Sequence, residues 1–398
     1  YLPKHFLHYQ QMKVLHINTY DTGGAGKACL RIHKALLDVG FDSKVLLRNK
    51  ALKDTPEVYE IWEELGTIKK AQKFLQQKKI ERGQVEIISE LGHVGELFSF
   101  PESIWDIVSH PLYEWADIIH MHWVAGFVDW STFFPRNTKK TVWTLHDEEP
   151  FLGGFHYPPT GGFSPYLNLI EKHLAIKKKV LANQRIEVVS PSRHLAEKSR
   201  DSSLFSGYPH QVIMNCTNTD AFKYIDQQSA QKTLNLPIDK KIVLFVADEM
   251  NYPRKGLEVV LNAMGAMGAI LLCTVGKGTI KESKNIVHLG QINDEERMNL
   301  IYASADLFVI PSLMDNLPNT IAESLCAGTP VIGFNVGGIP EMVQDEFGLL
   351  CNPNSTDLAK NILKGLSMNW DRKNISETNR NFYYEEKCAQ AYISVYES

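Results

Sequence analysis

Two acids, Asp315 and Glu323, are separated by seven residues and flank the predicted start of a helix over residues 319–327. Pro318 suits the first turn of that helix, because a proline has no N–H group to leave unpaired there. The free N–H groups and the dipole of a helix start attract phosphate, and the Glu323 carboxylate, about one turn further on, can accept hydrogen bonds from ribose hydroxyls. The stretch therefore predicts a site for a nucleotide with a second group attached. The residues predicted to line it are Asn316, Leu317, Pro318, Asn319, Thr320 and Glu323.

Two cations lie at another predicted helix start, after a buried strand at residues 241–246. Lys255 at this point can reach a diphosphate, and Arg254 is beside it. The alternative is a solvated Arg-Lys pair without a ligand. Cations at a helix start oppose the helix dipole, so this alternative is less favourable. We therefore predict that both side chains bind the phosphates.

A glycine-rich segment at residues 19–26 follows the first predicted strand and precedes a helix. It has neither the Gly-Lys-Ser/Thr ending of a Walker loop nor the spacing of a dinucleotide fingerprint. Gly23 and Gly24 would let backbone N–H groups approach an anionic group. A simple tight turn explains the two glycines equally well.

Histidines gather at the ends of two further predicted strands, His120 and His122 near residue 121, and His146 with Asp147 after residue 145. Ligands of open α/β sheets collect past the carboxyl ends of strands, so these side chains are well placed. Their types would suit a metal, but neighbouring strand ends produce such clusters without one, and we predict no metal site. The long glycine- and proline-rich loop at residues 151–166 also suggests function rather than connection.

Strands and helices alternate along the chain, which is the pattern of parallel sheets covered by helices on both faces. With 398 residues the chain is long enough for two domains, each with its own core. The sequence therefore predicts an α/β protein with two Rossmann-like domains, at residues 12–212 and 213–374. Residues 375–398 are predicted to contain one long terminal helix, 375–396.

Composition excludes some classes of function. The net charge of −4 gives no general affinity for nucleic acid, and no apolar run approaches the roughly 18 residues of a membrane-spanning helix.

The six cysteines are scattered without a Cys-x-x-Cys pair, which predicts buried free thiols in a reducing cytoplasm. Residues 1–11 precede Met12 without the pattern of a signal peptide, and are either a tag remnant or an upstream extension.

A basic helix is predicted over residues 68–82, with apolar contacts at Phe74 and Leu75. Such a helix either lies on anionic lipid or is a solvated surface helix. The first alternative would place a cytoplasmic protein peripherally on the inner face of the membrane.

The motif of Asp315, seven residues and Glu323 resembles the signature of family 4 retaining glycosyltransferases, whose first acid is usually a glutamate. Lys255 and the strand end VWTLHD at His146 match the family as well, whereas its usual arginine a few residues before the lysine is absent. The resemblance covers nearly the whole chain from Met12 and is strongest toward the bacterial surface-polysaccharide branch. It implies the GT-B fold, in which two Rossmann-like domains face a cleft and the last helix packs back across the first domain.

The resemblance also implies the activity: transfer of a sugar from a UDP- or GDP-linked donor to a saccharide or lipid-linked acceptor, with retention and without a metal. His146, Lys255 and Asp315 would be the catalytic residues. Gly23 and Gly24 would help to bind the donor, and the base would lie near residues 287–292. Two alternatives stay open: a non-catalytic subunit that binds sugar nucleotide or polysaccharide, and a sugar-nucleotide epimerase on the same fold.

Overall fold

The computed structural model describes residues 12–398, apart from 53–54, 64–65, 93–94, 266 and 282. The two interpretations of residues 1–11 therefore lie outside the described part of the chain. The chain forms two compact units: the residues up to Ile213 together with Ala389–Ser398 make the first domain, and Met214–Cys388 make the second.

The first domain is built on a sheet of seven parallel strands in the order β3-β2-β1-β4-β5-β6-β7. Its central strands are buried along most of their length, as expected for a parallel sheet covered on both faces. The strands are β1 (Lys13–Tyr20), β2 (Asp42–Asn49), β3 (Val58–Glu60), β4 (Ile118–Met121), β5 (Lys140–Thr144), β6 (Ile186–Ser190) and β7 (His210–Val212).

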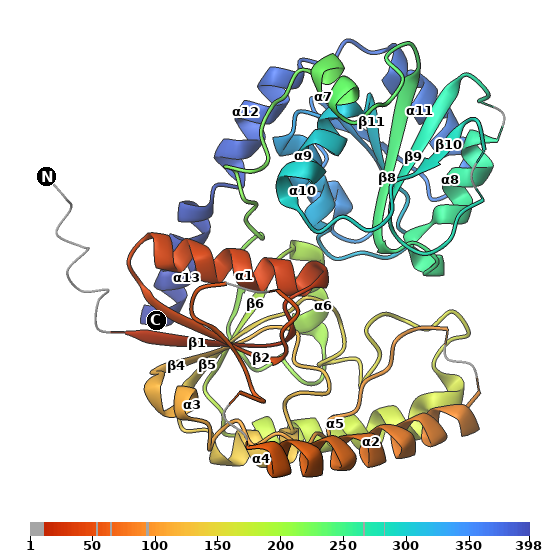
Figure 1. Cartoon of the computed structure of the whole chain (residues 1–398). Helices are drawn as coiled ribbons and strands as arrows, with labels where there is room; N and C mark the ends of the chain where they lie inside the picture. Colours follow the sequence, from red (N-terminus) through yellow and green to blue (C-terminus); the bar gives the residue numbers. More distant parts are fainter. Residues whose placement is uncertain (1–11, 53–54, 64–65, 93–94, 266, 282) are drawn as a thin grey trace, which may run out of the picture. The chain divides into compact units, whose positions relative to one another are not determined.

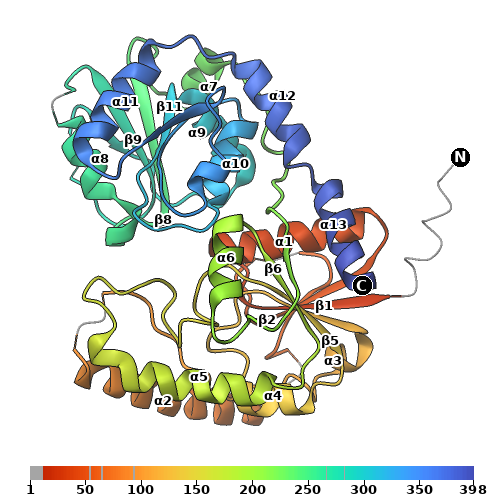
Figure 2. The same ribbon diagram turned by 180° about the vertical axis from the view of Figure 1, so that it is seen from behind.

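Helices cover both faces of this sheet. They are α1 (Gly23–Asp38), α2 (Thr67–Glu90), α3 (Pro111–Trp115), α4 (Trp130–Arg136), α5 (Leu167–Leu181), α6 (Arg193–Asp201) and most of α13 (Glu385–Glu397). Helices α1 and α13 lie on one side of the sheet, and α4 and α5 lie on the other (Figure 1, Figure 2). The core on the second side is aromatic, because Trp143 of β5 packs on Trp130 and Phe134 of α4, with ring centroids 5.1 and 5.9 Å apart.

The second domain has a sheet of six parallel strands in the order β10-β9-β8-β11-β12-β13. Short apolar sequences such as LFVI and VIGF form its fully buried central strands. The strands are β8 (Lys241–Glu249), β9 (Ile270–Lys277), β10 (Ile286–His288), β11 (Leu307–Ile310), β12 (Val331–Phe334) and β13 (Gly348–Cys351).

Two apolar cores, one on each face, hold the helices of the second domain to its sheet. One core includes residues of α9 and α10, and the other includes residues of α8 and α11. The helices are α7 (Gln227–Thr233), α8 (Leu257–Met264), α9 (Glu295–Ser304), α10 (Asn319–Cys326), α11 (Ser355–Ser367) and α12 (Arg372–Phe382).

Each sheet has a topological switch point, where the strand order reverses. It lies between β1 and β4 in the first domain and between β8 and β11 in the second. Open α/β sheets bind their ligands at the carboxyl ends of the strands beside such a point. The α/β class and the two Rossmann-like domains are thus confirmed, while the cleft between the domains stays a prediction.

The prediction of one terminal helix over residues 375–396 is wrong, because the helix is interrupted between α12 and α13. The carbonyl of Tyr383 accepts a hydrogen bond from the Thr217 backbone N–H at 3.1 Å, and the Glu385 carboxylate accepts one from the Thr219 hydroxyl at 2.7 Å. The Tyr383 carbonyl thus accepts a tertiary hydrogen bond in place of a helical one, and the Glu385 side chain fixes the start of α13. Residues up to Cys388 belong to the second domain, and Ala389–Ser398 belong to the first.

Three smaller predictions can also be checked. All six cysteines are free and buried, which confirms that part of the prediction. None of the described helices is long and apolar enough to span a bilayer. The basic helix predicted over residues 68–82 is α2, which begins at Thr67 and continues to Glu90.

Candidate functional site

An ion pair lies across the switch point of the second sheet. The ammonium Nζ of Lys255, in the segment that follows β8, is 2.6 Å from Oδ2 of Asp315, in the loop that follows β11. The Lys255 side chain is 24% exposed and the Asp315 side chain only 9%, so the cation is the member that solvent and ligands reach. The structure therefore brings together two residues that are sixty positions apart in the sequence.

Backbone contacts fix the two loops that carry this pair. The N–H of Leu313 donates to the carbonyl of Arg254 at 2.7 Å, which ties the loops directly. Gly256 has a left-handed φ of 76°, and a Cβ there would lie 2.1 Å from the Pro311 carbonyl oxygen. Only glycine allows this close approach, and helix α8 accordingly begins at Leu257, after a short 3-10 turn, and not at the lysine.

Asp315 stays ionised in spite of its burial. Burial alone would raise the pKa of its carboxyl, but the charges of Lys255 and Arg254, with a hydrogen bond from the Ser312 hydroxyl at 3.2 Å, hold it below its usual value. A permanent carboxylate anchors the flexible lysine side chain in one position. Such an arrangement presents a fixed cation to an anionic ligand.

Helix α10 begins next to this pair in the sequence, with Pro318 as its N-cap residue. Asn319 accepts a hydrogen bond from the Asn215 side chain at 3.0 Å. Leu317 is buried in the apolar core, and Asn316 is buried as well. Of the residues predicted to line the nucleotide site, Asn319 and Thr320 keep partly exposed positions at the helix start.

Glu323 lies on the same helix and is 3% exposed. Its Oε2 accepts a hydrogen bond from the Tyr302 hydroxyl at 3.0 Å, a contact that the sequence did not reveal. Tyr302 is fully buried on α9, so the carboxylate is held on the inner side of α10. Its predicted contact with a ribose stays a prediction.

In the first domain, the glycine-rich segment forms a tight helix start. Helix α1 begins at Gly23, which has a left-handed φ of 74°, and not after residue 26 as the sequence suggested. A Cβ on Gly26 would lie 2.6 Å from the backbone carbon of Asp21. The Asp21 carboxylate in turn accepts hydrogen bonds from the backbone N–H groups of Ala51 and Leu52 at 2.8 and 2.7 Å. Donor binding by Gly23 and Gly24 stays a prediction.

Histidine side chains form a buried layer at the other switch point. Nδ1 of His16, on β1, is 2.9 Å from Nε2 of His122, and Nδ1 of His122 is 3.1 Å from Nε2 of His146. His120 stacks beside them, with ring centroids 4.7 Å from His16 and 4.2 Å from His122. The predicted group of three histidines is thus brought together with a fourth, His16, which the prediction missed. The signal available in the sequence was a histidine inside the apolar run of β1. Its pairing in register with His120 is seen only in the structure.

Helix α13 closes this layer. The Tyr396 hydroxyl is 2.7 Å from Nδ1 of His120, and the Tyr392 hydroxyl is 2.9 Å from the Thr144 hydroxyl, which also contacts Nε2 of His120. Because the rings of Tyr392 and Tyr396 are buried, these hydrogen bonds satisfy polar groups that water does not reach. Neither tyrosine was singled out from the sequence.

Burial keeps the histidines neutral at ordinary pH. It lowers the pKa of His16, His120 and His122 well below the usual value, and it lowers the pKa of His146 to about 4 although the Asp147 charge opposes this. Neutral imidazoles donate from one nitrogen and accept at the other.

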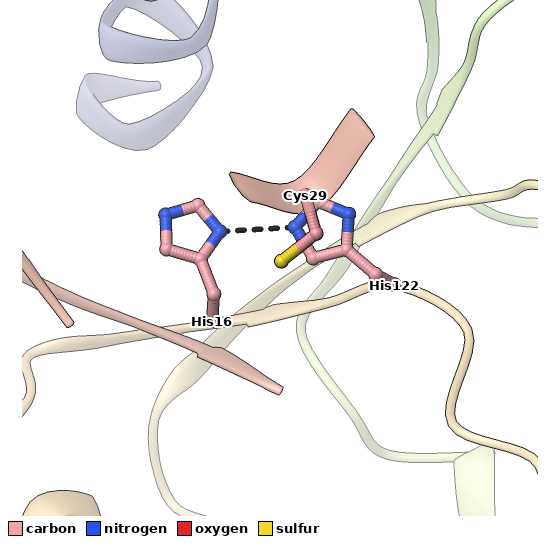
Figure 3. A group of neighbouring side chains, drawn as sticks. All are labelled: His16, Cys29 and His122. Atoms are coloured by element: carbon pink, nitrogen blue, oxygen red, sulfur yellow. Dashed lines mark hydrogen bonds between the residues drawn. The ribbon is translucent and has the colours of Figure 1, made fainter. Parts of the chain in front are cut away.

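Potential metal-ligating atoms of His16, Cys29 and His122 lie within 4.8 Å of one another. The two imidazoles point at one another (Figure 3), at the 2.9 Å spacing of a hydrogen bond. Burial raises the pKa of the Cys29 thiol, and a thiol must lose its proton to bind a metal. The geometry is therefore that of a hydrogen bond, and the predicted absence of a metal stays a prediction.

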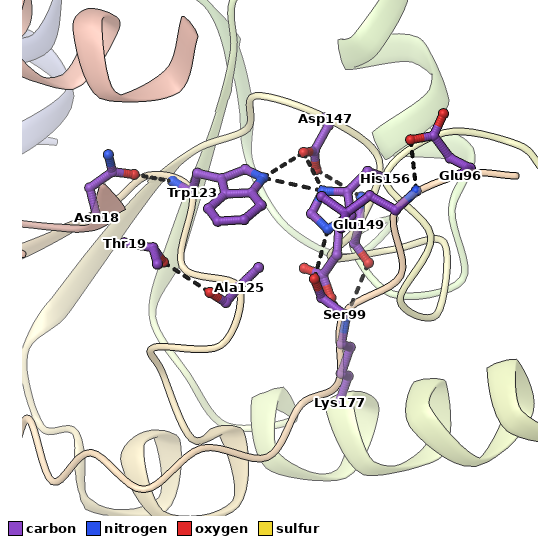
Figure 4. A network of polar contacts seen from close by, with 11 residues as sticks. Asn18, Thr19, Glu96, Ser99, Trp123, Ala125, Asp147, Glu149, His156 and Lys177 are labelled. Atoms are coloured by element: carbon purple, nitrogen blue, oxygen red, sulfur yellow. Dashed lines mark hydrogen bonds and ion pairs between the residues drawn. The ribbon is translucent and has the colours of Figure 1, made fainter. Parts of the chain in front are cut away.

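Asp147 belongs to a different network from that of its neighbour His146 (Figure 4). Its Oδ2 is 2.6 Å from Nδ1 of His156 and 2.7 Å from Nε1 of Trp123. Burial raises the pKa of Asp147, but these partners lower it more, so the group is an anion. His156 comes from the loop at residues 151–166, which this network anchors.

A buried ion pair lies beside this network (Figure 4). Nζ of Lys177, which is not exposed at all, is 2.7 Å from Oε1 of Glu149. It also donates to the carbonyls of Glu149 and Pro150, at 3.1 and 3.2 Å, and lies 4.6 Å from the Trp130 ring centroid. A lysine in the middle of a helix gave no signal of this role in the sequence.

Comparison with known proteins matches residues 240–368 to the family "Glycosyl transferases group 1". An uncharacterized glycosyltransferase of Methanocaldococcus jannaschii is 24% identical over 61% of this chain, and the alignment spans 63% of the relative's length, less than two thirds. The D-inositol 3-phosphate glycosyltransferase of Thermobispora bispora is 24% identical over 82% of this chain and 77% of its own.

The fold is shared with solved structures. The structure of the Anabaena protein HepE in complex with UDP and glucose superposes with a TM-score of 0.67, at 16% identity, over 98% of this chain and all of that one. The matched family segment contains both Lys255 and Asp315 at the switch point. Residues 240–368 thus match the group 1 glycosyltransferases, and the two parallel sheets have the GT-B fold of the solved structures.

Proposed function

We propose that this chain transfers a sugar, with retention, from a UDP- or GDP-linked donor to a saccharide or lipid-linked acceptor, in the synthesis of a surface or capsular polysaccharide. The observation that carries the proposal is the Lys255–Asp315 pair at the switch point of the second sheet. The UDP and glucose in the HepE complex support the class of donor.

Breaking the anomeric C–O bond of a nucleotide sugar leaves negative charge on a diphosphate, and the protein must stabilise that charge. In the proposed mechanism Lys255, with Arg254 beside it and the N–H groups at the start of α10, does so without a metal. The departing phosphate helps to remove the acceptor proton, which gives attack on the same face. His146, which is neutral, contacts the donor sugar or the acceptor.

The deciding experiment is a screen of UDP- and GDP-sugars in which nucleotide release is measured with and without saccharide acceptors, in buffer containing EDTA. We expect release that depends on an acceptor and survives the chelator. A binding subunit would bind a sugar nucleotide without release, and an epimerase would alter the sugar without release, so either result would overturn the proposal. Activity that needs added magnesium or manganese would contradict the metal-free mechanism alone.

Glu323→Gln is expected to weaken UDP binding about 10- to 100-fold, because the loss of hydrogen bonds to a charged group costs roughly 1.5–3 kcal/mol. Calorimetry with UDP, or with GDP if the screen selects it, measures the affinity. Tyr302→Phe is the matched control, since it removes the buried partner of Glu323 and leaves the carboxylate. An affinity that Glu323→Gln leaves unchanged would show that the carboxylate only supports the fold.

Helix α2 supports the peripheral membrane contact that forms part of the proposal. Large apolar side chains on it are exposed to an unusual extent, with Ile68 at 77%, Leu75 at 68% and Phe74 at 54%. At helical spacing these three share one side with the exposed cations Lys78 and Arg82. Apolar side chains among cations are what an anionic lipid surface binds.

The double variant Ile68→Ser/Leu75→Ser is expected to reduce co-sedimentation with phosphatidylglycerol-containing vesicles at least about tenfold, because each side chain contributes roughly 1.5–3 kcal/mol when buried. Ile238→Ser/Leu363→Ser is the matched control, with exposed fractions of 55% and 54% in the second domain. Equal losses in both double variants, or equal binding to phosphatidylcholine alone, would contradict a specific contact through α2.

A further inference from the structure

The three histidines His16, His122 and His146 form a chain that runs from the interior of the first domain to its partly exposed edge. Each adjacent pair shares one hydrogen bond, of 2.9 Å at the inner end and 3.1 Å at the outer end. His16 and His122 are buried, whereas His146 keeps a partly exposed position past the end of β5. In both links, Nδ1 of the inner ring faces Nε2 of the outer ring.

The protons of this chain can be counted. A neutral imidazole carries one N–H, so three rings have three protons, and each of the two links needs one. His122 takes part in both links but has only one proton, so it must donate in one link and accept in the other. Both hydrogen bonds therefore point the same way, either outward toward His146 or inward toward His16.

His16, at the inner end of the three histidines, decides the direction of hydrogen-bond donation. Nε2 of His16 is buried and has no hydrogen-bond partner among the residues that the structure describes. Inward donation would put the third proton on that atom and leave an N–H group unpaired in the interior. Buried N–H groups without an acceptor are rarer in native proteins than acceptors without a donor, so outward donation is favoured. The third proton then lies on Nδ1 of His146.

We propose that His16 and His122 are positioning residues that hold His146 in the Nδ1–H tautomer, so that His146 acts on its ligand as a hydrogen-bond donor. His120 stands outside this constraint, because both of its nitrogens contact hydroxyl groups, which can donate or accept. The tautomer follows from the hydrogen bonds among His16, His122 and His146. Only its use, donation to an oxygen of the sugar or the acceptor, rests on the proposed function.

The tautomer can be read directly by long-range ¹H–¹⁵N NMR of the whole chain labelled with ¹⁵N-histidine, at neutral pH. We expect His146 to show a protonated Nδ1 and an unprotonated Nε2. A protonated Nε2 on His146 overturns the proposal in the unmodified protein, whatever the activity of the enzyme. A spectrum in which added Zn²⁺ shifts His16 and His122 overturns it too, because it assigns a metal site there.

His122→Phe keeps a ring in the stack and removes the donor to His146. We expect the His146 signals to move toward the Nε2–H pattern, and kcat for sugar transfer to fall roughly 10²-fold, the loss typical of one donor at a transition state. Tyr396→Phe is the matched control, because it removes a buried hydroxyl from His120 and leaves the chain intact. An unchanged tautomer in folded His122→Phe overturns the positioning role, whereas a changed tautomer with unchanged kcat contradicts only the proposed use of His146.

Discussion

Lys255→Ala is expected to lower kcat about 10²–10³-fold, the usual cost of losing one preorganised group that stabilises transition-state charge. The charge on the leaving diphosphate grows as the sugar bond breaks, so the contact strengthens toward the transition state and kcat falls more than the donor KM rises. The variant should still bind the free nucleoside. Steady-state kinetics with the donor found in the screen measure both constants.

The ion pair adds a second consequence to this variant. Asp315 is buried, so Lys255→Ala leaves a carboxylate whose main counter-charge has been removed. Lys255→Arg keeps the charge and should recover only part of the rate, because the planar guanidinium of arginine does not have the geometry of a compact ammonium. Lys241→Ala is the matched control: Lys241 also pairs with an aspartate, Asp306, at 2.8 Å, but at the start of β8. If Lys255→Ala retains more than about a tenth of kcat, another group neutralises the diphosphate.

Glu149→Gln is expected to lower the free energy of unfolding of the first domain by about 3–5 kcal/mol, because it leaves the fully buried Lys177 ammonium without its paired carboxylate. Urea unfolding followed by tryptophan fluorescence reports mainly on this domain, since Trp370 is the only one of the seven tryptophans outside it. The double variant Glu149→Gln/Lys177→Met should recover most of the loss, because a neutral pair of similar volume is often as stable as a buried ion pair.

The matched control for this prediction is Lys34→Met, which breaks the Lys34–Asp38 pair on α1 of the same domain. Both side chains there are more than half exposed, so the loss should stay below about 1 kcal/mol. A Glu149→Gln variant that loses no more than this control would show that the carbonyls of Glu149 and Pro150 are sufficient to solvate the lysine.

The sheets were predictable because buried parallel strands are short apolar runs with helices between them. LFVI and VIGF fall at the predicted strands of the second domain, and the loops at their carboxyl ends carry the predicted residues. The pairing of Lys255 with Asp315 was not predictable, because it depends on β8 and β11 lying side by side. The sequence pattern assigns a separate role to each residue, and neither role includes the other residue.

Contacts that depend on distant elements were missed for the same reason. The sequence singled out Glu323 by its spacing from Asp315, but its partner Tyr302 lies on a helix before the strand and has no motif around it. His16 joins the other histidines only through the register of β1 with β4. The interrupted terminal helix depends on hydrogen bonds from Thr217 and Thr219, more than 160 residues earlier in the chain.

The discontinuity of the first domain has a consequence for biosynthesis. Tyr392 and Tyr396 complete its histidine layer, but they are translated only after the whole of Met214–Cys388. Domains generally fold as units from the N-terminus onward while the ribosome is still elongating. Here the later domain has all of its residues first, and the earlier domain must wait on the ribosome with His120 and Thr144 uncovered. The first domain is therefore completed only after the second, although most of its residues are translated earlier.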